Sequence, residues 1–129
     1  MAIAINNVVN DVADSSPISY NAGSGDNRIL VVAIGMAWES DNAITAISYG
    51  GSALTRAGMK ADPYNWGRAE LWYLFNPASG ANNISVTSGN NSIAPMSIAY
   101  LTGANTTSIG NTGNNASEST SQSVSITPG

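Results

Sequence analysis

The chain has 129 residues, enough for one domain with a buried core, and 43% of them are hydrophobic. It contains no histidine and no cysteine, which excludes a Ser-His-Asp triad, a disulfide bond and a zinc site built on imidazole or thiolate ligands. Four basic and eight acidic residues give a net charge of −4, and the basic residues form no run, which argues against a nucleic-acid-binding protein because such a protein needs a basic face.

Neutral residues supply most of the polar character. The chain contains 16 Asn, 18 Ser, 9 Thr and 13 Gly. Asn, Ser and Gly favour turns, because they tolerate or locally stabilise unusual backbone angles. Helices would carry more Glu, Lys, Arg and Leu than this chain supplies. The composition therefore predicts an all-β domain with many turns.

The N-terminal part of the chain predicts three strands. Residues 2–9 alternate and indicate a first strand at a sheet edge. Residues 11–17 are predicted as a loop, and residues 18–20 as a short strand. Residues 29–38 are almost continuously apolar and rich in β-branched side chains, and Gly35 together with the turn formers before them argues against a helix. We expect them to form a central strand that is buried on both faces.

A Gly-Gly pair marks the next feature. Gly50 and Gly51 separate two apolar runs, residues 44–49 and 52–58, and predict a two-residue hairpin because such turns need positive φ angles. The following residues 59–67 include a proline and are predicted as a loop.

Residues 68–75 predict a strand that is apolar on both faces. One face carries Ala69, Leu71, Tyr73 and Phe75, and the other carries Glu70, Trp72 and Leu74. Residues 76–83 then read as a turn and residues 84–88 as a shorter strand.

The C-terminal part predicts one buried strand and one alternating strand. Residues 93–103 form the buried strand, and Pro95 requires a strand start, a bulge or an edge there. Residues 104–120 are predicted as a polar loop, and residues 121–127 alternate again. The whole pattern of seven to nine short strands predicts a single antiparallel β-sandwich domain, jelly-roll-like, over residues 1–129.

No feature predicts a membrane protein. The N-terminus lacks a basic start followed by a long apolar run, so no Sec-type signal peptide is expected. No segment reaches the ~20 apolar residues that a membrane-spanning helix needs.

Carboxylates offer little for catalysis. A two-carboxylate glycosidase needs a pair about 5–10 Å apart. The nearby pairs are Glu39 with Asp41 and Glu70 with Asp62. Glu70 is the best single candidate acid, but we favour a solvated strand face on which it pairs with Arg56 or Arg68 across the sheet. The protein is therefore predicted not to be an enzyme.

Three loops contain oxygen ligands that calcium would accept, each with only two or three of the six to eight it needs. They hold Asp26 with Asn27, Glu39 with Asp41 and Asn42, and Asp62 with Asn65. No spacing matches an EF-hand, and turn formation explains these residues equally well. No metal and no cofactor is predicted.

Aromatic side chains remain as candidates for recognition. Trp38 and Trp72 lie in predicted strands and are expected in the core. Tyr64 and Trp66 flank Asn65 in a proline-containing loop, where aromatic residues can stack on a sugar ring or anchor a protein interface. An alternative is that Trp66 folds back over the end of the sandwich. The predicted contact residues are Tyr64, Asn65 and Trp66.

Several segments resemble a recurrent β-sandwich domain of phage structural proteins and bacterial surface proteins. They are NRILVVAIGM (27–36), ITAISYGGSALTRAG (44–58), AELWYLFNPASGANNISVT (69–87) and IAYLTGAN (98–105). The resemblance implies a lectin-like or jelly-roll sandwich in virions or on cell surfaces, and it implies no catalytic residues. Such domains continue for several strands beyond the part that resembles residues 121–129. We therefore expect either a shorter topology or completion by a neighbouring subunit, through exchange of the strand at residues 2–9.

These observations predict a non-enzymatic structural module of a virion surface, a decoration, fibre or tail component, at the virion surface or in the extracellular space. Its expected partners are copies of itself or a capsid or tail protein, and neither nucleic acid nor membrane. One alternative is a carbohydrate-binding module that uses the loop aromatics on a glycan. Another is a subunit of a self-assembling extracellular filament.

Overall fold

The computed structural model describes residues 2–12, 16–37, 44–61, 63–64, 67–88 and 95–108, and these ranges contain β-strands and no helix. The strands are β1 (Ala4–Val12), β2 (Ile18–Asn21), β3 (Ile29–Ala37), β4 (Ile44–Tyr49), β5 (Ser52–Ala53), β6 (Thr55–Ala61), β7 (Gly67–Phe75), β8 (Ala81–Ser88) and β9 (Pro95–Thr102). Within the described ranges, nothing qualifies as a helix long and apolar enough to cross a membrane.

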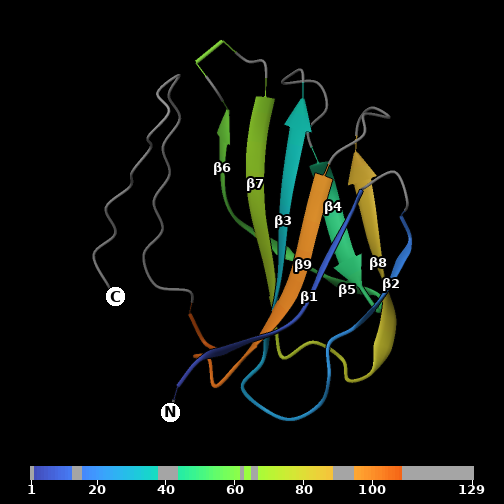
Figure 1. The fold of residues 1–129 in the computed structure, drawn as a ribbon, viewed down its shortest axis with the longest axis vertical. Helices are drawn as coiled ribbons and strands as arrows, with labels where there is room; N and C mark the ends of the chain where they lie inside the picture. The colour runs from blue at the N-terminus through green and yellow to red at the C-terminus, as the bar shows by residue number, and fades with distance from the viewer. Residues whose placement is uncertain are drawn as a thin grey trace.

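The strands form two antiparallel sheets. The five-stranded sheet has the order β1-β9-β3-β7-β6, and the four-stranded sheet has the order β2-β8-β4-β5. Figure 1 shows β6, β7, β3 and β9 following one another from left to right. One residue, Leu54, separates β5 from β6, so the chain changes sheets there. If β5 and β6 are taken as one strand that spans both sheets, the order is that of a jelly roll, completed within residues 4–102.

The core lies between the two sheets. In β3 the alternate residues Leu30, Val32 and Ile34 are buried and face the second sheet, and Trp72 of β7 joins them. From the opposite sheet Tyr49 and other side chains complete the cluster, which includes Ile18, Tyr20, Ile44, Ile47 and Ile84. Burial of these aliphatic and aromatic side chains provides the main stabilisation of the sandwich.

Asn7 links β1, the edge strand of the first sheet, to β2, the edge strand of the second sheet. The β1 ladder shifts register between Asn6 and Val9, and Asn7 has a φ angle of 46°. The Asn7 side-chain amide donates to the Asn21 carbonyl at 2.8 Å, and the Tyr20 hydroxyl donates to the Asn7 carbonyl at 2.8 Å. These two bonds tie the edge of one sheet to the edge of the other. Strand β1 pairs with β9 of the same chain, and its exchange between copies stays a prediction.

A buried arginine holds two loops together. Arg28 is only 4% exposed, and its guanidinium donates to the carbonyls of Ala22, Gly25 and Pro77. Because these acceptors come from the loop before β3 and from the turn after β7, one side chain fixes the ends of several strands.

Several predictions from the sequence are confirmed. Gly50 and Gly51 form the two-residue turn between β4 and β5, with φ angles of 56° and 85°. Strand β9 begins at Pro95, one of the positions that a proline allows. The first strand lies at a sheet edge, and Trp72 is in the core.

Other boundaries were wrong. Strand β6 continues to Ala61, because Lys60 and Ala61 pair with Ala69 and Arg68 of β7, so the loop predicted at residues 59–67 is shorter. Strand β1 likewise continues to Val12, and β8 begins at Ala81.

Strand β3 was predicted to be buried on both faces, but Ala33 is exposed on its outer side. No described segment covers that side of the sheet. Trp38, residues 109–120 of the predicted loop and the strand predicted at residues 121–127 lie outside the described residues.

Candidate interaction surface

Of the three predicted contact residues, the structure describes Tyr64 only. It follows Pro63 in the turn between β6 and β7 and is 58% exposed. Asn65 and Trp66 lie outside the described residues. The structure therefore shows an exposed aromatic ring at Tyr64, and contact through the three residues together stays a prediction.

Glu70, the candidate acid, is buried rather than solvated, which corrects the predicted exposed strand face. Its side chain is 0% exposed, because it lies on the inner side of β7 with Trp72 and Leu74. Arg56 approaches one carboxylate oxygen at 3.1 Å, and Arg68 approaches the other at 3.3 Å. The predicted pairing is thus confirmed with both arginines.

The environment of Glu70 indicates a structural role. The Arg56 guanidinium lies 5.9 Å from the centroid of the Trp72 ring, so it contacts a carboxylate and an aromatic face together. A general acid must come within hydrogen-bond reach of the bond it protonates. The Glu70 carboxylate is buried; Arg56 donates a hydrogen bond to one of its oxygens, and Arg68 lies 3.3 Å from the other.

The candidate metal ligands do not form a site where they are described. Among the described residues, no three of His, Cys, Asp and Glu gather within reach of one ion. Asp26 and Asn27 are exposed in a bend, and Asn27 has a φ angle of 56°, as expected for a turn former. The other candidates, Glu39, Asp41, Asn42, Asp62 and Asn65, lie outside the described residues.

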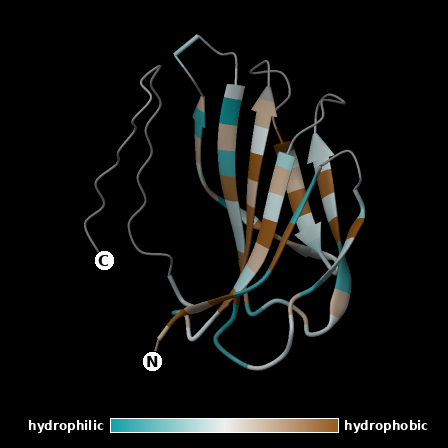
Figure 2. Cartoon of the chain, in the orientation of Figure 1, coloured by the Kyte–Doolittle hydropathy of each residue, from teal (hydrophilic) through white to brown (hydrophobic). Residues whose placement is uncertain are grey.

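The least expected feature is the outer side of the five-stranded sheet. Most of its outward residues are apolar on four neighbouring strands, and we call these apolar residues the outer apolar face: Ile5, Ile29, Val31, Ala33, Ala69, Leu71, Tyr73, Phe75, Ala99 and Leu101. Asn10 and Ser97 are polar residues that also face outward. Within the face Ile29 is buried, and several residues are half-buried, namely Val31, Tyr73, Phe75, Ala99 and Leu101. The hydropathy colouring in Figure 2 shows apolar segments along β3, β9 and the start of β1. Ile5 and Leu71 are exposed by 68% and 44%.

The register of the sheet aligns this face in rows. Each row runs across β9, β3 and β7, and the rows are Leu101–Ile29–Phe75, Ala99–Val31–Tyr73 and Ser97–Ala33–Leu71. The Tyr73 and Phe75 rings lie 5.0 Å apart at a tilt of 53°. Side chains in such rows contact one another directly, so the surface is continuous.

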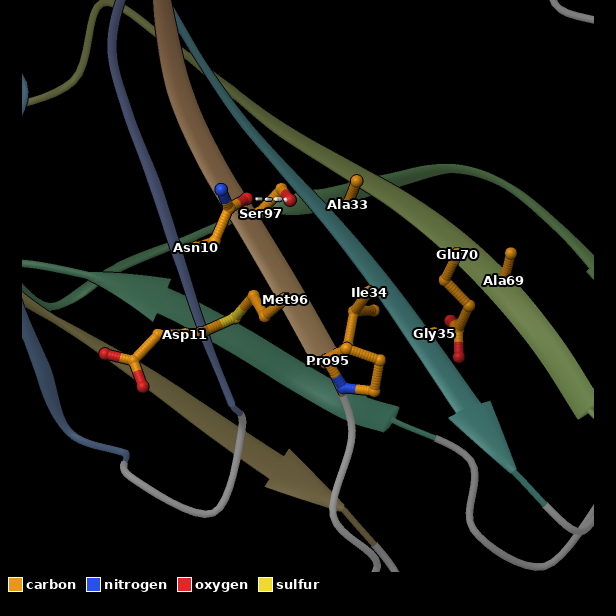
Figure 3. Close-up of a pocket in the computed structure, with 10 residues that line it drawn as sticks. All are labelled: Asn10, Asp11, Ala33, Ile34, Gly35, Ala69, Glu70, Pro95, Met96 and Ser97. Atoms are coloured by element: carbon orange, nitrogen blue, oxygen red, sulfur yellow. Dashed lines mark hydrogen bonds between the residues drawn. The ribbon is translucent and has the colours of Figure 1, made fainter.

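Charge is almost absent from the outer apolar face. Among the described outward positions of the five strands, only Lys60 of β6 is charged, and it lies at the sheet edge opposite Ala69. Glu70 faces inward. Figure 3 shows the Asp11 carboxylate pointing away from the residues of β3 and β7.

Small side chains leave a depression in this face. It has a volume of about 360 Å³; small residues such as Ala33, Gly35, Ala69 and Ser97 line it, and so do the acidic residues Asp11 and Glu70. Figure 3 shows Asn10 at its β1 side, where the Ser97 hydroxyl donates to the Asn10 side-chain oxygen at 2.6 Å. A methyl group built on Gly35 would meet only Pro95, at 3.8 Å, so the space above it is open.

The second sheet has a different outer side. Its outward positions carry hydroxyls and amides, from Ser19, Asn21, Ser48, Asn83, Ser85 and Thr87. This is the alternation expected of a sheet with one face in the core and one in water. The two sides of the same molecule therefore differ in kind: one is hydrated and neutral, and the other is apolar.

In comparisons with known proteins, no family model matches the chain, and neither a curated protein nor a solved structure matches it.

Sequence reasoning missed the outer apolar face, although the signal was present. Residues 29–38 and 68–75 were both recognised as apolar on two faces, and no helix was predicted that would cover them. When a sheet contains such strands, its second apolar side is either exposed or covered by another segment of the chain or by a partner protein.

Proposed function

We propose that the protein is a non-enzymatic structural module of a virion surface, a decoration, fibre or tail component, that acts through protein–protein assembly. Its partners are copies of itself or a capsid or tail protein. The single observation that supports assembly is the outer apolar face. The virion setting rests on the resemblance of the strand and hairpin segments to a domain of phage structural proteins and bacterial surface proteins.

The outer apolar face supports a protein partner for a physical reason. Soluble monomers rarely expose apolar patches of more than a few hundred Å². Here Leu71 and Ile5 are 44% and 68% exposed on a sheet whose described outward positions carry one charge, that of Lys60 at the edge. The core of a protein interface has the same character: it is apolar, contains aromatic residues and is depleted of charge.

Nucleic acid is a poorer partner. Arg28 is buried against carbonyls, and the Arg68 side chain is 8% exposed beside Glu70. This leaves Arg56 and Lys60 as the exposed basic side chains, too few to neutralise a run of phosphates.

The assembly function is tested by the size of the purified protein in solution. We expect light scattering to give a mass above 13.2 kDa that rises with protein concentration, and electron microscopy to show discrete assemblies. A protein that stayed monomeric at millimolar concentration and bound no capsid or tail protein would contradict the proposal.

The exposure of Tyr64 favours one alternative, a carbohydrate-binding module. An aromatic ring that is 58% exposed beside the loop of Asn65 and Trp66 offers a stacking surface for a sugar ring. Titration calorimetry of wild type, Tyr64→Ala and Trp66→Ala with glycans distinguishes the two functions. Glycan binding that both variants lose, in a protein that does not assemble, would favour this alternative.

A self-assembling extracellular filament differs from the main proposal in symmetry. A face that packs on itself closes into a dimer, whereas two different faces in contact produce an open chain. Electron microscopy of the wild type distinguishes closed particles from fibres.

A further inference from the structure

We propose that the outer apolar face packs against the same face of a second copy around a two-fold axis, so that Leu71 of each copy enters the depression of the other. This inference rests on the proposed assembly function and names the partner and the surface that it uses.

The charge distribution favours a second copy. The chain has a net charge of −4, so two copies repel one another at long range and a contact is favoured where carboxylates do not face each other. The outward positions of the five strands carry Lys60 at the edge and no carboxylate among the described residues. Of the two acidic residues that line the depression, Glu70 is buried against two arginines and the Asp11 carboxylate points away from β3 and β7 (Figure 3), so two such faces can meet without bringing carboxylates together over Leu71.

The shape of the face is self-complementary. Leu71 is 44% exposed and projects from β7 two residues after Ala69, which lines the depression. Alternate residues of a strand lie about 7 Å apart. The projecting side chain and the depression are therefore neighbours, and a two-fold axis between them places each Leu71 over the small residues of the partner.

In an isologous contact, residue i of one copy meets residue j of the other, and j meets i in return. Leu71 and the depression lined by Ala33, Gly35 and Ala69 satisfy this requirement on one surface. The hollow exists because glycine and alanine occupy adjacent positions of β3 and β7, where Gly35 pairs with Ala69.

The area is that of a weak dimer. Four strands about 4.8 Å apart and seven residues long cover roughly 450 Å² on each copy. Two such faces bury about 900 Å², which lies in the range of weak, transient interfaces. We therefore expect a dissociation constant of roughly micromolar order rather than nanomolar.

The absence of cysteine from the chain makes a direct test available. Ala69→Cys places one thiol close to the proposed axis, and Thr87→Cys places one on the outer side of the second sheet as a matched control. Under mild oxidation at a concentration near the dissociation constant, we expect Ala69→Cys to form a covalent dimer at least ~10-fold faster than Thr87→Cys, because the interface holds its two thiols together.

A second pair of variants tests the energetics. Leu71→Asp brings two carboxylates into the apolar contact, and Thr87→Asp adds the same charge to the hydrated side. We expect Leu71→Asp to raise the dimer dissociation constant at least ~100-fold and Thr87→Asp to change it less than ~3-fold. Both positions are exposed, and circular dichroism with thermal unfolding verifies that both variants fold.

The outcomes separate this inference from the function on which it rests. Self-association that survives Leu71→Asp, or equal cross-linking of both cysteine variants, would overturn the face-to-face dimer and leave the assembly function standing. If the wild type is a monomer and the thiol of Ala69→Cys reacts fast with thiol reagents, the inference is also overturned, because the face is then open. A monomer in which the thiol of Ala69→Cys is protected would overturn it too, since another segment of the same chain then covers the face.

Discussion

The two buried charged residues Arg28 and Glu70 have different kinds of partner. Arg28 donates to backbone carbonyls at the ends of strands, whereas Glu70 is held between two arginine side chains. A buried charge that loses its partners is costly, because its hydration has already been removed. Both residues therefore support the fold through these contacts.

Removing either member of the Glu70–Arg68 pair should destabilise the protein. We expect Glu70→Gln and Arg68→Met each to lower the free energy of unfolding by about 2–4 kcal/mol, because Glu70→Gln leaves the buried Arg68 without its carboxylate and Arg68→Met leaves the buried Glu70 with the half-exposed Arg56 alone. The double variant should lose at least ~1 kcal/mol less than the sum of the two. Urea unfolding of the four proteins measures this difference.

Arg56→Met is the control for that cycle. The Arg56 side chain is 43% exposed, so its loss should cost about 1 kcal/mol or less. If the effects of Glu70→Gln and Arg68→Met simply added, the ion pair would not be the source of the stabilisation.

Ionisation of the Tyr20 hydroxyl makes the free energy of unfolding depend on pH in the alkaline range. Burial raises the pKa of its hydroxyl well above the ordinary value of 10.0, and the neighbouring Tyr100 and Tyr49 raise this pKa further. Above pH 10, the Tyr20 hydroxyl ionises in the unfolded chain while it stays protonated in the folded one. The unfolded state then binds fewer protons, so stability falls as pH rises.

The expected size of this effect follows from the thermodynamic linkage between proton binding and folding. Between about pH 10.5 and 12, wild type should lose stability more steeply than Tyr20→Phe, by up to about 1.4 kcal/mol per pH unit. Tyr20→Phe also loses the hydrogen bond to the Asn7 carbonyl, which lowers stability at every pH and leaves the slope unaffected. Equal slopes in urea unfolding across this range would contradict the account.

At the scale of single elements, the β4–β5 hairpin allows a matched comparison. Gly50 and Gly51 both have positive φ angles, which disfavours alanine at each position. A Cβ atom on Gly50 would lie 3.1 Å from the Asn82 side chain, whereas one on Gly51 would meet nothing within 4 Å. We expect Gly51→Ala to cost about 1 kcal/mol and Gly50→Ala about 2 kcal/mol in thermal unfolding. Equal costs would show that the contact with Asn82 relaxes freely.

Strand β7 shows how much a local pattern can predict. Alternation assigned its two faces correctly, and the glycine pair identified the β4–β5 hairpin. It placed Glu70 in solvent, because a carboxylate on a strand is usually exposed. One partner of the buried Glu70, Arg56, lies on β6 and reaches it only through the pairing of β6 with β7. That pairing continues to Ala61 across residues that were predicted as a loop.

The candidate surface was less predictable than the fold. The sequence indicated contact through Tyr64, Asn65 and Trp66, because aromatic residues in a loop are recognisable one by one. The outer apolar face is formed by strands β1, β9, β3 and β7, which are far apart in the sequence. Their outward residues become one surface only through the register of the sheet, which a single chain pattern does not specify.

At the scale of the whole molecule, the assembly should depend little on ordinary salt. The outer apolar face holds no carboxylate among its described residues, so screening has few interactions to weaken. Raising sodium chloride from about 0.05 to about 0.5 M should change the dimer dissociation constant less than ~3-fold, whereas sodium sulfate should strengthen the dimer. Light scattering in the two salts measures this. A steep loss of the dimer in sodium chloride would indicate a contact made by charged groups elsewhere.

The central claim is that the outer apolar face is the surface through which this protein assembles. Sedimentation velocity of wild type and Leu71→Asp, each from about 1 µM to about 1 mM, tests it most directly across the expected micromolar range. We expect wild type to shift from monomer to dimer over this range and Leu71→Asp to stay monomeric throughout. A Leu71→Asp protein that dimerises as wild type does would contradict it.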